Sequence, residues 1–181
     1  MFIHSPLSAA LVILDPDPAH RDLTLSEDGR RVGWTDNPQI PPDNLNKFTA
    51  SQCVLGWEGF TSGGHYWEVQ LLQRGLVWAV GVARGSLRQK GVMRVSPEWG
   101  LWAVSWWWGA DGRYRALTSP PTLLSPRQPP LKLGLYLDYE GGRLSLYNAD
   151  TWEHLYTFND SFTGGLRPFF WLDEDTVLRL V

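Results

Sequence analysis

The sequence predicts an all-β protein, folded as an antiparallel sandwich of two sheets. Three observations support this fold class: short runs in which apolar and polar residues alternate, turn-forming residues between these runs, and many aromatic side chains. The 181 residues include 11 Trp, 18 Gly and 13 Pro, a composition typical of β structure. The length fits one globular domain with a substantial core.

Alternation with a period of two marks the strands. The clearest runs are HYWEVQLL (65–72), LKLGLYLD (131–138) and RLSLYN (143–148). The run LVWAVGVA (76–83) is apolar on both faces and predicts a central strand that is covered on both sides. Further candidate strands, in chain order, lie at 22–26, 31–35, 51–56, 100–107, 113–118, 154–158 and 176–181.

Turn signals separate these runs. SEDG (26–29), TSGG (61–64) and GADG (109–112) predict tight turns, and DYEGG (138–142) predicts a hairpin between two alternating strands. One short helix is expected at 4–12, ahead of the sheets. Longer loops are predicted at 41–44, 119–130 and 159–165.

The stretch LWAVSWWWGADG (101–112) holds four of the tryptophans. In a strand over 101–107, Trp102 and Trp106 share the uniformly bulky face, which we assign to the core. Ser105 and Trp107 share the mixed face, which we assign to solvent or a ligand. Trp108 begins the following turn. Trp67 and Trp78 are also expected in the core, whereas Trp57, Trp99 and Trp152 are left open between edge cover and exposure.

Composition argues against several functions. The net charge is -3, so no basic surplus is available for nucleic acid, and the apolar runs are too short to cross a bilayer. No Walker loop, GxSxG elbow or metal-ligand spacing occurs, so we expect no enzyme activity, no cofactor and no metal site. The lone Cys53 is expected as a buried strand residue, and Asp173–Asp175 as a solvated loop.

An ordered series of motifs makes the chain similar to a known family. It includes LDPDPAH (14–20), LTLSEDGRRV (23–32), CVLGWEGFTSGGHYWEV (53–69), LGLYLDYEGGRLSLYN (133–148) and TFNDSFTGGLRPFF (157–170). Over residues 11–181 this series resembles the PRY-SPRY domain of tripartite-motif (TRIM) ubiquitin ligases and butyrophilins. The resemblance implies a bent β-sandwich with a lead-in segment at 1–10, a PRY part at 11–60 and a SPRY part at 61–181.

The resemblance also implies a recognition module without catalysis, in which loops at one end of the sandwich form an aromatic pocket for a protein or peptide segment. Ligase activity would belong to a separate RING domain. Trp107 matches a contact position of this family. The resemblance also suggests Trp34, Asp36, Trp108 and Trp171. Ser105 is a candidate because it shares the face of Trp107, and Arg113 and Tyr114 are further candidates.

Two other functions stay open. Butyrophilin-type pockets that sense small phosphorylated metabolites are rich in His and Arg, whereas the stretches 49–53 and 86–91 offer only Arg88 and Lys90 as cations. A carbohydrate binder would stack sugar rings on exposed tryptophans. For the leading hypothesis we expect a protein partner, a monomeric domain, and a cytoplasmic location or a place in the cytoplasmic tail of a membrane receptor.

Overall fold

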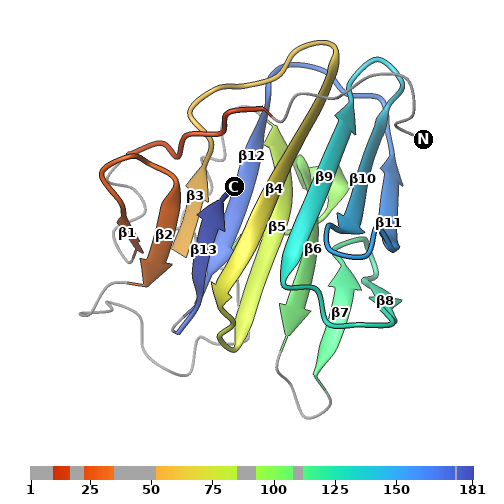
Figure 1. Cartoon of the computed structure of the whole chain (residues 1–181). Helices are drawn as coiled ribbons and strands as arrows, with labels where there is room; N and C mark the ends of the chain where they lie inside the picture. Colours follow the sequence, from red (N-terminus) through yellow and green to blue (C-terminus); the bar gives the residue numbers. More distant parts are fainter. Residues whose placement is uncertain (1–9, 17–22, 35–51, 85–92, 108–111, 174) are drawn as a thin grey trace.

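The computed structural model describes residues 10–16, 23–34, 52–84, 93–107, 112–173 and 175–181. Within these ranges, two antiparallel sheets face each other (Figure 1). The seven-stranded sheet has the order β1-β2-β13-β4-β9-β10-β11, and the six-stranded sheet has the order β3-β12-β5-β6-β7-β8. The predicted two-sheet antiparallel sandwich is therefore confirmed.

The strands follow the alternating runs of the sequence. Those of the seven-stranded sheet are β1 (Leu23–Leu25), β2 (Arg31–Trp34), β4 (Gly64–Gln73), β9 (Lys132–Asp138), β10 (Arg143–Asn148), β11 (His154–Asn159) and β13 (Val177–Leu180). Those of the six-stranded sheet are β3 (Cys53–Leu55), β5 (Val77–Arg84), β6 (Leu101–Trp107), β7 (Arg113–Ala116), β8 (Thr122–Leu124) and β12 (Leu166–Leu172). A single turn of 3-10 helix, Pro97–Trp99, precedes β6.

The main hydrophobic core lies between the two sheets. Trp67 of β4, Trp78 of β5, and Trp102 and Trp106 of β6 all belong to it, as the alternation predicts. The hairpin predicted at 138–142 is also present, since Asp138 of β9 pairs with Arg143 of β10. The apolar faces of the alternating strands therefore meet in one shared interior.

A second cluster covers the outer face of the six-stranded sheet. It consists of Val77, Ala79, Ala83, Met93, Leu101, Ala103, Leu117, Phe169 and Trp171. Strand β5 places Trp78, Val80 and Val82 in the main core and Val77, Ala79 and Ala83 in this outer cluster. This arrangement confirms that 76–83 contains a central strand covered on both sides.

The structure differs from the sequence expectations at the N-terminal segment and at Asp173. Of the helix expected at 4–12, residues 4–9 lie outside the described ranges, and residues 10–12 are not helical. The expected solvated loop at Asp173–Asp175 is wrong for Asp173, which is completely buried. Its carboxylate accepts hydrogen bonds from the Val77 N–H (3.0 Å) and the Thr176 hydroxyl (3.1 Å), so it joins the end of β12 to the start of β5.

Candidate functional site

Cross-strand pairing brings several of the sequence-predicted site residues onto the outer face of the six-stranded sheet. Trp171 pairs with Ala79, which pairs with Ser105, which pairs with Arg115. In a neighbouring row, Trp107 pairs with Arg113. Directly paired residues point to the same side of a sheet. We call the group Ser105, Trp107, Arg113, Arg115 and Trp171 the outer-face site.

Exposure differs sharply within the outer-face site. Trp171 is 0% exposed and Ser105 is 1% exposed, so they form part of its floor. Trp107 is half-buried against the outer cluster, and Arg113 is exposed. In this structure Trp107 and Arg113 therefore provide accessible surface, while Trp171 and Ser105 lie beneath it. The assignment of the mixed face of 101–107 to solvent or a ligand is wrong for Ser105, because this face of β6 belongs to the buried outer cluster through Leu101 and Ala103.

The Ser105 hydroxyl is a second feature of this floor. It is buried and has no hydrogen-bond partner in the part of the chain that the structure describes. An unsatisfied buried hydroxyl is unusual, since most buried polar groups are hydrogen-bonded. Arg115, which lies directly across from Ser105 on β7, is partly buried. The floor thus holds a small buried hydroxyl on the residue that pairs with Arg115.

Other predicted site residues do not join this group. Tyr114 points into the main core, with its ring 4.5 Å from that of Trp106, and its hydroxyl accepts a hydrogen bond from Arg74 Nη1 at 3.2 Å. Burial raises the pKa of this phenol. Trp34 ends β2 in the opposite sheet and packs partly against the main core. Asp36 and Trp108 lie outside the described residues.

Sequence reasoning missed Arg115, although the signal was available. Arg113 and Arg115 are two positions apart on β7 and therefore share a face, while Tyr114 between them faces the opposite way. Applying the alternation used for 101–107 to this strand would have chosen both arginines and rejected Tyr114 for the outer face.

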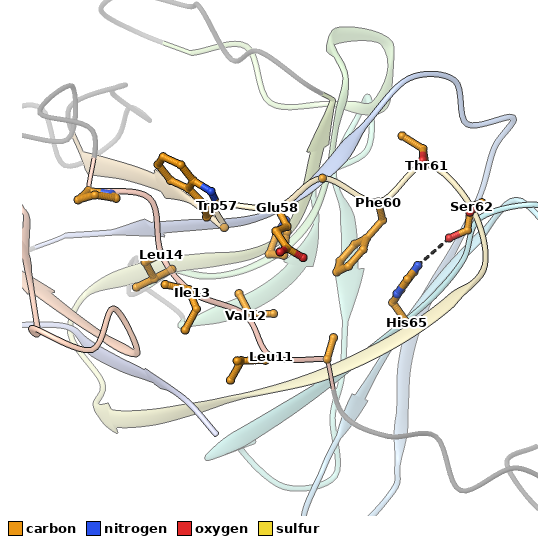
Figure 2. Close-up of a pocket in the computed structure, with 15 residues that line it drawn as sticks. Leu11, Val12, Ile13, Leu14, Trp57, Glu58, Phe60, Thr61, Ser62 and His65 are labelled. Carbon is orange, nitrogen blue, oxygen red and sulfur yellow. Dashed lines mark hydrogen bonds between the residues drawn. The ribbon is translucent and has the colours of Figure 1, made fainter.

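A separate groove lies beside the N-terminal segment (Figure 2), and none of its lining residues belongs to the outer-face site. It has a volume of about 830 Å³. Residues 10–14 form one side, and residues 57–62 together with His65 form the other. We call it the N-terminal groove. Sequence analysis did not predict it, because the two segments are far apart in the chain.

The second side of the N-terminal groove is held in place by His65. Its ring stacks on Phe60 with centroids 3.9 Å apart, and its Nε2 donates to the Ser62 carbonyl oxygen at 2.6 Å, as Figure 2 shows. Behind the groove, Arg167 donates to the Gly56 carbonyl (2.7 Å) and to Asp15 Oδ2 (2.7 Å). These contacts fix the 56–65 turn against the start of the domain.

The His, Cys, Asp and Glu side chains of the described residues are dispersed. No group of three or more His, Cys, Asp or Glu side chains that could hold a metal occurs among them. Cys53, at the start of β3, is partly buried, and burial raises the pKa of its thiol to about 12. A thiol with this pKa is protonated near neutral pH and is a poor nucleophile.

Comparison with known proteins identifies the family. The SPRY domain model matches residues 64–180, and the model of the SPRY-associated domain, PRY, matches residues 12–60. The chain belongs to the PRY-SPRY family. Within the described part of this PRY-SPRY domain, no helix is long and apolar enough to cross a membrane.

The relatives of this PRY-SPRY domain include butyrophilins and TRIM-like proteins. It is 44% identical over 170 residues to human butyrophilin subfamily 2 member A2, covering 93% of this chain and 32% of that protein. It is 42% identical over 158 residues to nuclear factor 7, ovary, of Xenopus laevis, covering 87% of this chain and 25% of that protein. The chain therefore spans about a third or less of the length of these relatives.

Solved structures show the same fold. The crystal structure of the TRIM65 PSpry domain superposes with a TM-score of 0.76 at 25% identity, covering 96% of this chain and 93% of that one. The stonustoxin structure superposes with a TM-score of 0.74 at 26% identity, covering 96% of this chain and 27% of that one. PRY-SPRY domains are non-catalytic interaction modules of TRIM and butyrophilin proteins, and they generally bind protein targets.

Proposed function

We propose that this PRY-SPRY domain binds a protein segment at its outer-face site, with Trp107 and Arg113 as the principal contacts. The observation that carries the proposal is their direct pairing on one face of β6 and β7, with Trp107 half-buried and Arg113 exposed. Trp and Arg are the residue types that most often dominate binding energy at protein interfaces.

The neighbours of Trp107 suit this role. The outer cluster supports the indole from one side, so its orientation is fixed before a partner arrives. A preorganised contact loses less conformational entropy on binding than a mobile one. A partner that covers Trp107 can also place a carboxylate or a carbonyl oxygen beside the exposed Arg113 guanidinium.

A pull-down from cell lysate, with quantitative mass spectrometry, tests the proposal. Wild type and Trp107→Ala serve as bait, and any protein lost with the variant is purified and its dissociation constant measured with both. A specific protein that depends on Trp107, and that binds the purified wild-type domain directly, supports the outer-face site. Identical lists for the two baits remove Trp107 from the binding surface.

Small phosphorylated metabolites are a second candidate ligand at the same face. Arg115 lies across from the unsatisfied Ser105 hydroxyl, and a guanidinium beside a hydroxyl donor suits a phosphate group. Thermal denaturation with and without inorganic pyrophosphate tests this candidate. A rise in the melting temperature that disappears in Arg115→Gln would favour it, and an unchanged melting temperature would reject it.

We infer a lead-in segment at 1–10, a PRY part at 11–60 and a SPRY part at 61–181, with the domain itself monomeric. The parent protein would be TRIM-like or butyrophilin-like. The domain would then work in the cytoplasm, either in a free protein or as the cytoplasmic tail of a receptor.

A further inference from the structure

The N-terminal groove combines apolar exposure with a shape that an extended chain can fill. Leu11 is 73% exposed and Trp57 is 62% exposed, and Ile13 and Phe60 also line the groove. Figure 2 shows Leu11 and Ile13 along one side and Phe60 on the other. Exposed apolar side chains gathered around a hollow mark interaction surfaces more often than scattered ones do.

The backbone at Leu11 is an unfilled position in a short antiparallel ladder. The Ile13 carbonyl accepts from the Trp57 N–H (2.7 Å), and the Asp15 N–H donates to the Leu55 carbonyl (2.8 Å). On the other side, the Leu14 N–H donates to the Gly29 carbonyl (2.9 Å). In an extended segment, alternate residues direct their backbone groups to opposite sides.

By this alternation, Leu11 directs its N–H and carbonyl to the same side as Ile13 and Asp15, which is the groove side. The ladder has no rung at Leu11, because the opposite chain turns away after Trp57. No residue in the described ranges bonds to the Leu11 backbone. An incoming strand could therefore pair with Leu11, which is how β-strand addition recognises peptides.

The charge of the N-terminal groove selects among extended peptides. Glu58 lines the groove with an exposed carboxylate that forms no ion pair in the described part of the chain. No Lys or Arg occurs among the described lining residues, whose other ionisable side chain is His65. A cationic partner group is therefore complementary to this groove and an anionic one is not.

We propose that the N-terminal groove binds an extended peptide that carries a bulky apolar residue next to a Lys or Arg. The peptide backbone pairs with Leu11, its apolar side chain enters between Ile13 and Phe60, and its cation pairs with Glu58. This surface is separate from the outer-face site, so the domain holds two peptide-binding surfaces of different chemistry.

Selection from a phage-displayed library of random peptides tests the proposal on the whole 181-residue domain. Parallel selections use wild type, Glu58→Lys, and Glu27→Lys as a matched control, because Glu27 is an exposed carboxylate that does not line the groove. We expect a peptide class from wild type and Glu27→Lys that has an apolar residue beside Lys or Arg. Glu58→Lys should instead select Asp or Glu at that position.

A synthetic peptide from the wild-type class is then titrated into each protein. We expect at least a tenfold weaker affinity for Glu58→Lys, no change for Glu27→Lys, and chemical-shift changes at the Leu11 amide in the wild-type NMR spectrum. The proposal is overturned if Glu58→Lys selects the same basic peptides as wild type. It is also overturned if the basic peptide binds without perturbing the Leu11 amide.

Discussion

The indole of Trp102 donates a hydrogen bond from Nε1 to Asp160 Oδ2 at 3.0 Å. Trp102 is 0% exposed near the start of β6, and Asp160 follows β11 in the opposite sheet. Phe162 packs edge-on against the same indole, with ring centroids 5.1 Å apart. This bond links the two layers of the sandwich and gives the buried indole N–H of Trp102 a hydrogen-bond partner.

Removing the acceptor of this bond should weaken the fold. Asp160→Ala leaves the buried Trp102 N–H without a partner, which we expect to lower the free energy of unfolding by about 1–3 kcal/mol. Asp160→Asn keeps an amide oxygen at the same place, so its free energy of unfolding should fall clearly less. Urea unfolding of wild type and the two variants measures these differences. An Asp160→Ala variant as stable as wild type would show that the bond contributes nothing to stability.

The sequence predicts most of the fold because the strands obey simple alternation. It separates Trp102 and Trp106 from Trp107 correctly, since one residue of shift moves a side chain to the other face. It misplaces Asp173, because local composition does not reveal that its carboxylate accepts a hydrogen bond from Val77, 96 residues away in the chain. A pattern within one segment carries no information on such a long-range contact.

The candidate sites are harder to predict for the same reason. The outer-face site depends on which strands pair, and the register that joins Trp171, Ala79 and Ser105 spans three separate segments. Sequence alternation could place Ser105 and Trp107 on one face, but it could not show that Trp171 lies sealed in the floor. The N-terminal groove forms only when segment 10–14 meets segment 57–62.

Gly81 is required by the close approach of β5 and β6. A Cβ atom at this position would overlap the Trp102 carbonyl oxygen and lie 2.6 Å from the Ala103 Cα. Because these are backbone atoms that cannot rotate away, we expect Gly81→Ala to lower the free energy of unfolding by about 3 kcal/mol. Gly33→Ala is the control, since its new methyl would meet nothing closer than 3.5 Å. Equal free energies of unfolding for Gly81→Ala and Gly33→Ala in urea titrations would show that glycine is not required at position 81.

Asp173 should be structural rather than a surface charge. Asp173→Ala leaves the Val77 N–H and the Thr176 hydroxyl without this acceptor, which we expect to lower the free energy of unfolding by about 2 kcal/mol or more. Asp175→Asn, two residues away at an exposed position with φ 66°, should change it little, because Asn tolerates this conformation. A stable Asp173→Ala variant would mean that the buried carboxylate is dispensable.

Cys53 should be unreactive in the native protein. Burial raises the pKa of its thiol to about 12, although the nearby Arg167 charge lowers it slightly. We expect iodoacetamide at about pH 8 to label Cys53 slowly in the folded domain and rapidly in urea. Rapid labelling of the native protein, followed by mass spectrometry that places the label on Cys53, would contradict this expectation.

The same pKa shift predicts a dependence of stability on pH. The thiol ionises more easily in the unfolded chain than in the folded one. Its contribution to the free energy of unfolding is therefore complete below its ordinary pKa and is lost as the pH rises toward about 12. The stability of wild type relative to Cys53→Ala should therefore fall between about pH 8 and about pH 10.5. A difference that stays constant over this range would show that the thiol does not titrate differently on folding.

The central claim is that the half-buried Trp107 serves binding, whereas the enclosed Trp102 serves the fold. Its most direct test uses a partner protein that was purified by means of the wild-type domain. Calorimetry measures the dissociation constant of this partner for wild type and for Trp107→Ala. Urea unfolding measures the stabilities of Trp107→Ala and Trp102→Ala. The account predicts about 30-fold weaker binding for Trp107→Ala. It also predicts a stability loss of about 3–5 kcal/mol for Trp102→Ala and a much smaller one for Trp107→Ala. Unchanged affinity for Trp107→Ala, or a stability loss equal to that of Trp102→Ala, would contradict it.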